Sequence, residues 1–174
     1  MSNEKPQSKA ISLRDQIDGS LTTAGYRYKR TGNTETCIRY NLGMALKIGH
    51  TDLFILCHFD RGLLEIVSRV PFSVPEKYIK EVSLYLHEVN LRMNIGHFDF
   101  DTSQGSIHSR TSILLKDLEL EQEVFEKCLY LNLNVIAIEF EFGQADIALA
   151  NLERIPDGGM FGQLARLAES AVVD

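Results

Sequence analysis

The stretch from Asn90 to Ile113, NLRMNIGHFDFDTSQGSIHSRTSI, decides the fold, because a helical pattern gives way there to two short strands. A loop at Thr102–Gly105 reverses the chain, and Gly105 supplies the positive φ that such loops need. The sequence therefore predicts an antiparallel β-hairpin in which Asp101 pairs with Ser106. The register that follows pairs Phe100 with Ile107, Asp99 with His108, Phe98 with Ser109 and His97 with Arg110.

Side chains alternate along a strand, so this hairpin has one apolar and one polar face. The apolar face is expected to be core and consists of Phe98, Phe100, Ile107 and Ile113. The polar face carries the candidate site residues His97, Asp99, Asp101, His108 and Arg110. Opposite charges across a ladder are typical of a solvated sheet face, so we expect this face to meet water. The alternative is an enzyme or metal-binding site, because imidazoles and carboxylates this close together are also metal ligands.

Composition and the missing motifs together predict one ordinary domain with no cofactor. The chain has 174 residues, of which 44% are hydrophobic, enough for a single core. No apolar run approaches the ~20 residues of a membrane helix, and residues 1–9 are too polar for a secretory signal, so a cytoplasmic protein is expected. Cys37, Cys57 and Cys128 form no C-x-x-C pair, which indicates free thiols. Phosphate-loop, nucleophile-elbow and zinc-protease motifs are absent, so we expect no catalytic, cofactor or metal residues and no enzymatic activity.

Charge is distributed unevenly along the chain. Residues 1–70 hold ten Lys/Arg against seven Asp/Glu, whereas residues 71–174 hold eight against seventeen, which gives the total of −6. This acidic balance disfavours nucleic acid as a partner. A lesser alternative remains at Tyr26–Arg30, where basic and aromatic residues interleave as in nucleic-acid-binding surfaces. The same alternation is typical of an edge strand guarded by Lys and Arg.

Periodicity predicts an α+β domain. Short β-rich runs follow a first helix that ends near Gly25, and a second helix should begin with a capping box formed by Ser73 and Glu76. The β-rich runs are Tyr26–Arg30, Cys37–Leu46 with an interruption near Gly43, Leu53–Phe59 and Leu63–Val70. The expected architecture is an antiparallel β-meander plus the β-hairpin in one sheet with flanking helices, in the order α-β-β-β-α-β-β-α, with an extra C-terminal helical segment.

The last long helix, expected over Leu118–Phe142, is apolar on more than half of its circumference. One stripe of this helix is Val124, Cys128, Leu131, Val135 and Ile138, and a second is Phe125, Leu129, Leu133, Ile136 and Phe140. One sheet face cannot cover both, so the first stripe is a candidate surface for a homodimer or a protein partner. The alternation IAIEFEF over residues 136–142 leaves helix or strand open there.

The hairpin motif carries a family resemblance. Asn90, Gly96, Phe98, Gly105, Ile107 and Arg110, with this order of elements, resemble the YbjN-like domain family over residues 10–142. That family is similar in fold to type III secretion chaperones. The resemblance implies a small non-enzymatic domain of the sensory transduction regulator type, whose chaperone relatives are homodimers that hold unfolded segments of a partner. It also implies structural roles for Asn90, Gly96, Phe98, Gly105, Ile107 and Arg110.

The segments outside that domain are expected to be a flexible N-terminus at 1–9 and a C-terminal helical extension at 143–174. The extension either covers its own domain or docks on a partner. The leading expectation for function is a protein-binding module, chaperone-like or regulatory, that works as a homodimer without nucleic acid or membrane.

Overall fold

The protein is an α+β domain built on one six-stranded antiparallel sheet. The computed structural model describes residues 6–137 apart from 33, 35, 47–48 and 116–118. The strands are β1 (Tyr28–Thr31), β2 (Cys37–Leu46), β3 (Gly49–His58), β4 (Leu63–Ser73), β5 (His97–Asp101) and β6 (Ser106–Leu114). The helices are α1 (Pro6–Thr23), α2 (Ile79–Arg92) and α3 (Gln122–Ile136), and a 3-10 turn, η1 (Glu76–Tyr78), leads into α2.

The sheet has the order β1-β2-β3-β4-β6-β5. The meander and the hairpin therefore share one sheet, which confirms the expected fold class. The short strand β1 overlaps the β-rich run Tyr26–Arg30, makes the observed order one strand longer than the expected one, and forms an edge of the sheet next to β2. None of the described helices has the length and apolar character of a membrane span.

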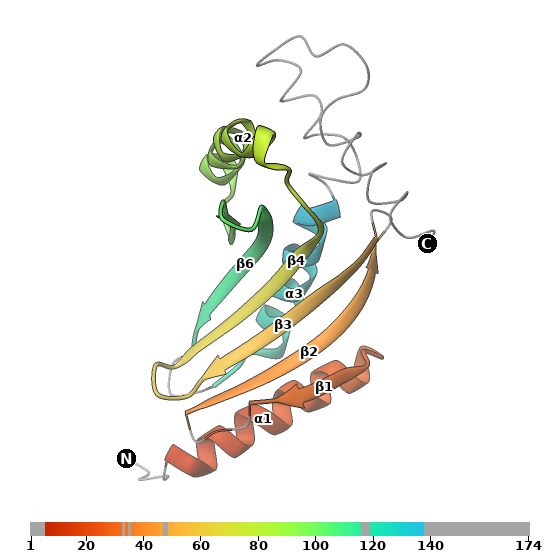
Figure 1. The fold of residues 1–174 in the computed structure, drawn as a ribbon. Helices are drawn as coiled ribbons and strands as arrows, with labels where there is room; N and C mark the ends of the chain where they lie inside the picture. The colour runs from red at the N-terminus through yellow and green to blue at the C-terminus, as the bar shows by residue number, and fades with distance from the viewer. Residues whose placement is uncertain (1–5, 33, 35, 47–48, 116–118, 138–174) are drawn as a thin grey trace.

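All three helices pack against the same face of the sheet. α1 and α3 cover β2 to β4 through one cluster of buried apolar side chains, and α2 covers the hairpin end through a second cluster. Figure 1 views the molecule from the other side, with β1 drawn in front of α1 and with α2 at the far end. We call this other side the open face, because no helix of the described residues packs on it.

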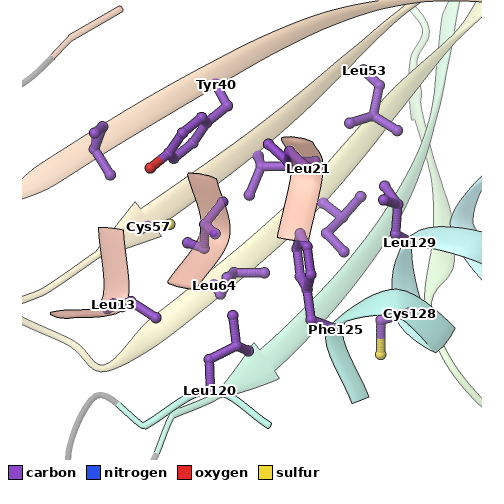
Figure 2. Packing of buried hydrophobic residues seen from close by; sticks show 14 of the residues in the cluster. Leu13, Leu21, Tyr40, Leu53, Cys57, Leu64, Leu120, Phe125, Cys128 and Leu129 are labelled. Atoms are coloured by element: carbon purple, nitrogen blue, oxygen red, sulfur yellow. The ribbon is translucent and has the colours of Figure 1, made fainter. Parts of the chain in front are cut away.

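The larger core lies between α1, α3 and the middle of the sheet. Leu13, Ile17 and Leu21 recur at helical spacing on α1, and each is fully buried. Figure 2 shows Phe125 reaching from α3 toward Leu21, with Leu64 of β4 nearby. The smaller core joins α2 to the hairpin and to the end of α3. Its members include Val70, Val82, Tyr85, Leu86, Val89, Phe98, Ile107 and Ile136.

A buried polar cluster lies where the two cores meet. The Asn132 side chain of α3 is fully buried, and its Nδ2 donates to the carbonyl oxygens of Ile66 and Ser109, each at 3.1 Å. Nδ2 also lies 3.2 Å from the hydroxyl of Thr111, and Oδ1 accepts from the hydroxyl of Ser68 at 2.5 Å. Because a buried amide is stable only when it is hydrogen-bonded, this cluster fixes the position of α3 on the sheet.

The hairpin has the predicted register from His97–Arg110 to Asp101–Ser106. Gly105 takes φ 66°, and its carbonyl accepts from the Val74 N–H at 2.7 Å. A Cβ on Gly105 would overlap the carbonyl of Val74, so the glycine is needed both for its φ and for this close approach.

Three expectations about element boundaries are wrong. β2 runs without interruption through Gly43, because Gly43 pairs with Asp52 in the ladder. Ser73 forms no cap with Glu76, since Ser73 ends β4 opposite Ser106 and the turn into α2 has no side-chain cap. The last helix begins at Gln122 rather than Leu118, after Leu120 has turned into the core.

The two ends of the described region bear on the remaining expectations. α1 begins at Pro6, inside the segment 1–9 that we expected to be flexible. Residues 138–142, including the alternating end of the last helix, and the extension at 143–174 lie outside the described residues.

The three cysteines are free thiols, as expected. Burial raises the pKa of each thiol, and the pKa of Cys57 reaches about 12. Cys57 and Cys128 are buried among apolar side chains, so neither thiol is activated as a nucleophile.

Candidate functional site

The predicted polar residues of the hairpin lie on the open face of the sheet. His97, Asp99 and Asp101 alternate with buried or half-buried phenylalanines on β5, and His108 and Arg110 face them from β6. The structure brings three of the five, His97, Asp99 and Arg110, into direct contact. Asp101 and His108 stay outside that group.

A ladder of alternating charge crosses four strands of the open face. Arg110 is its centre: Nε lies 2.7 Å from Asp99 Oδ2, and Nη1 lies 2.7 Å from Glu65 Oε1. His97 Nε2 extends the ladder at 3.0 Å from Asp99 Oδ1, and His58 Nε2 lies 3.0 Å from Glu65 Oε2. We call these five residues the ion-pair ladder. The hairpin sequence could not show Glu65 and His58, because they come from β4 and β3.

The ladder is more sheltered than the solvated face that the hairpin sequence predicts. The Glu65 side chain is 17% exposed and that of Arg110 is 31% exposed. Burial opposes the charge on Arg110, but the hydrogen bonds that Arg110 donates to Asp99 and Glu65 outweigh it and raise the pKa of the guanidinium. Arg110 is therefore charged at every physiological pH and holds both carboxylates across the sheet.

Asp101 and His108 have separate surroundings. Asp101 accepts hydrogen bonds from the hydroxyl and the N–H of Ser103, at 2.6 Å and 2.9 Å. These bonds lower the pKa of the Asp101 carboxyl and fix the hairpin turn. Burial, followed by the nearby charge of Arg69, lowers the pKa of His108. His108 therefore binds its proton only at a more acidic pH than an imidazole in water does.

The geometry gives no support to a metal site on this face. Within the described residues, no three His, Cys, Asp or Glu side chains come together in a way that could hold a metal ion. Both oxygens of Asp99 are engaged by Arg110 and His97, and Asp101 is turned toward Ser103.

Apolar side chains lie beside the ladder. Arg39 of β2 stacks over the Phe54 ring of β3, with the guanidinium carbon 3.9 Å from the ring centroid. At the other end of β6, Leu114 pairs with Leu63 and its side chain is 83% exposed. The open face therefore combines a charged region with an apolar end near Leu114.

The residues of the hairpin motif have structural roles. Asn90 at the end of α2 bonds the backbone of Phe98 in the outermost strand, and Phe98 and Ile107 are buried beneath α2. Gly96 has φ 77°, and a Cβ there would meet the backbone of β6 at 2.8 Å. With Gly105 in the loop, the motif shapes and protects this edge of the sheet.

The predicted partner surface on α3 is divided. Cys128 is buried, and Val135 is half-buried against the smaller core. Val124 and Leu131 remain 38% and 42% exposed. Ile138 lies outside the described residues. The stripe that the structure turns to the sheet is the second one, through Phe125, Leu129 and Ile136.

Further apolar side chains are exposed on the two later helices. Tyr130 lies beside Leu131 on α3 and is 66% exposed. On and just after α2, Leu84, Leu91 and Ile95 are each more than half exposed. Sequence periodicity missed the α2 group, because these residues fall outside its buried stripe; their spacing of seven and four residues was the available signal.

The basic-aromatic run at Tyr26–Arg30 overlaps the edge strand β1. Arg30 lies 3.3 Å from Asp18 of α1, and the Tyr28 ring packs edge-on against Tyr40. Two of its members are thus engaged within the domain, which favours the edge-strand interpretation over a nucleic-acid surface.

Fold comparison agrees with the motif. No protein-family model matches the sequence, and no curated protein matches it. Among solved structures, YbjN from E. coli, a proposed transcription regulator, has a TM-score of 0.51 at 11% identity, over 75% of this chain and 93% of that one. The chain therefore has the YbjN-like fold that the hairpin motif predicts.

Two further solved structures are similar at lower TM-scores. The HopA1–SchA chaperone–effector complex gives 0.48 at 15% identity, covering 72% of this chain and 93% of that chain. The ExsC–ExsE complex gives 0.47 at 16% identity, covering 75% and 92%.

Proposed function

We propose that the protein is a non-enzymatic protein-binding module, chaperone-like or regulatory, that works as a homodimer. The observation that carries the proposal is the exposure of large apolar side chains on helices whose buried stripes already complete both cores. Leu84, Leu91 and Ile95 project from the α2 region, and Tyr130 and Leu131 project from α3. Such exposed apolar groups mark surfaces that protein partners cover.

The homodimer contact is assigned to the exposed part of α3, around Val124 and Leu131. Size exclusion with light scattering tests it, and the expected mass is twice that of the 19.7 kDa chain. Leu131→Asp should shift the mass toward the monomer, whereas Gln122→Asp, which adds the same charge to an exposed position of α3, should not. A mass that stays near 19.7 kDa at every concentration contradicts the homodimer.

Protein binding is tested by capture from an extract of the source cells, followed by mass spectrometry. Leu91→Asp should lose the captured partner, and Arg92→Asp at the next exposed position of α2 should keep it. Catalytic turnover that depends on His97 or His108 would favour the enzyme alternative instead.

A further inference from the structure

The open face carries four of the five histidines of the chain. Side chains alternate on β3, so His50 and His58 lie opposite the buried residues Leu53 and Cys57. His97 and His108 lie on the same face in β5 and β6. The remaining one, His87, is exposed on α2.

Among the residues that the structure describes, the fixed charges of the open face cancel at neutral pH. Its basic side chains are Lys29, Arg39, Arg69 and Arg110. Its acidic side chains are Asp52, Glu65, Asp99 and Asp101. Four of each sign sum to zero, so protonation of the four histidines changes the face from neutral to +4. Histidine is the side chain whose charge changes between about pH 5 and pH 8.

Each histidine meets different charged neighbours. His58 contacts Glu65 and His97 contacts Asp99, so protonation turns both contacts into full ion pairs. Beyond His58, the turn between β3 and β4 adds Asp60 and Arg61, which pair with each other at 3.8 Å.

The other two histidines have no ion pair within the described residues. His50 shares a pocket with Asp52 and Arg69, and His108 is surrounded by Arg69, Arg110, Asp99 and Asp101. Neither imidazole is held in an ion pair, so protonation of His50 or His108 adds positive charge near Arg69.

A pocket with an exposed guanidinium lies between these two histidines. The pairing of β4 shifts between Arg69 and Ser73, and a pocket opens there that is lined by His50, Asp52, Arg69 and Pro71. Arg69 is exposed and has no ion pair among the residues that the structure describes. A guanidinium of this kind binds carboxylates well. Leu114 and Leu63 supply apolar contacts at the other end of the face.

We propose that the open face binds an acidic segment of a partner protein that also carries apolar side chains, and that histidine protonation tightens the binding as the pH falls. The inference rests on the proposed protein-binding function and names the surface and the chemistry of the partner. Carboxylates of the partner meet Arg69 and the protonated His50 and His108, and apolar side chains meet the end near Leu114. A basic partner is excluded at acid pH by like-charge repulsion.

The test uses the full chain and a fluorescein-labelled synthetic peptide of alternating aspartate and leucine, whose carboxylates stay ionised at about pH 5. Fluorescence anisotropy should give a Kd about tenfold lower at about pH 5 than at about pH 7.5, because up to four charges are gained. Added salt should reduce this gain. Circular dichroism at both pH values verifies that the protein remains folded.

Matched variants locate the effect. A His50→Gln, His108→Gln double variant should lose most of the decrease in Kd on acidification, whereas His87→Gln on α2 should keep that decrease. Arg69→Gln should raise the Kd at both pH values. Equal Kd values at both pH values in the wild type, or equal loss in the His87→Gln variant, would overturn the proposal.

Two further outcomes assign the face to another occupant and also overturn it. One is a scattering mass that doubles on acidification alone, which points to a second copy. The other is peptide binding that requires neutralising the seven Asp/Glu of residues 138–174, which points to the chain's own C-terminal segment. If a partner is captured at neutral pH but the peptide Kd does not fall on acidification, this inference alone is rejected. Failure of both experiments rejects the proposed function as well.

Discussion

Asn90 pairs with Phe98 as though it were the next strand of the sheet. The Asn90 Nδ2 donates to the Phe98 carbonyl at 2.9 Å, and the Phe98 N–H donates to Asn90 Oδ1 at 2.7 Å. β5 is the outermost strand at this side, so within the described residues no further strand pairs with its outward backbone groups. A single side chain on α2 thereby closes the edge and ties the helix to the hairpin.

Replacing Asn90 should therefore destabilise the protein. We expect Asn90→Ala to lower the free energy of unfolding by about 1–3 kcal/mol, because two partly buried hydrogen bonds are lost. Urea denaturation followed by circular dichroism measures the change. Asn94→Ala, at an exposed position just after α2, is the control and should stay within about 0.5 kcal/mol of the wild type. Equal effects at both positions would contradict the role of Asn90.

The two faces of the hairpin should respond differently to truncation. Phe98→Ala should cost about 3–5 kcal/mol, because it opens a cavity in the smaller core. Asp99→Ala should cost less than about 1 kcal/mol, since its ion pairs with His97 and Arg110 are partly exposed to water. Denaturation midpoints of the two variants decide the comparison. Similar losses would mean that the open face is covered in solution.

Asn132 should be the most sensitive polar residue of α3. Asn132→Ala leaves buried groups of Ser68, Ser109 and Thr111 without their partner, and we expect a loss of about 2–4 kcal/mol. Asn134→Ala on the same helix removes only an exposed hydrogen bond to the Tyr130 carbonyl and should cost less than about 1 kcal/mol. Thermal and urea unfolding of both variants test this difference.

Gly105 and Gly32 form a natural comparison for the cost of close packing. Both glycines have positive φ, 66° and 61°, but a Cβ at Gly32 meets nothing within 4 Å, whereas one at Gly105 overlaps the Val74 backbone. Gly32→Ala should cost about 1 kcal/mol from backbone strain alone, and Gly105→Ala should cost more than about 2 kcal/mol. Equal costs would show that the loop moves freely away from Val74.

The sequence predicted best where local rules and tertiary structure agree. The alternation of Phe98 and Phe100 together with the turn at Gly105 fixes the hairpin register, because a slip of one residue would expose both phenylalanines. The predicted interruption at Gly43 is wrong because pairing with a neighbouring strand outweighs the low strand propensity of glycine. The predicted capping box of Ser73 is wrong because Ser73 is paired with Ser106 at the end of β4.

Only the part of the candidate site that lies within the hairpin could be predicted from the sequence. His97, Asp99 and Arg110 are close in sequence across the hairpin, but Glu65 and His58 reach the ladder through the pairing of β4 with β6 and with β3. The buried hydrogen-bonding role of Asn132 could not be predicted for a related reason. A polar residue on an apolar stripe looks like an interruption until Ser68, Ser109 and Thr111 are placed opposite it.

The lowered pKa of His108 predicts part of the pH dependence of stability. Burial and Arg69 favour the neutral ring in the folded protein, whereas in the unfolded chain the ring titrates near ~6.5. Between the unfolded value and the lower folded value, the unfolded state binds more protons than the folded state. The free energy of unfolding therefore falls as the pH drops through that window.

His108→Gln removes this titration. We expect the variant to lose less stability than the wild type between about pH 7 and about pH 5, as measured by urea denaturation midpoints across a pH series. His87→Gln, at an exposed position of α2, should keep the wild-type pH dependence. If the wild type and the His108→Gln variant lose stability in parallel over this range, the surroundings of His108 do not lower its pKa. The contribution of His108 to peptide binding on the open face would then begin at a higher pH.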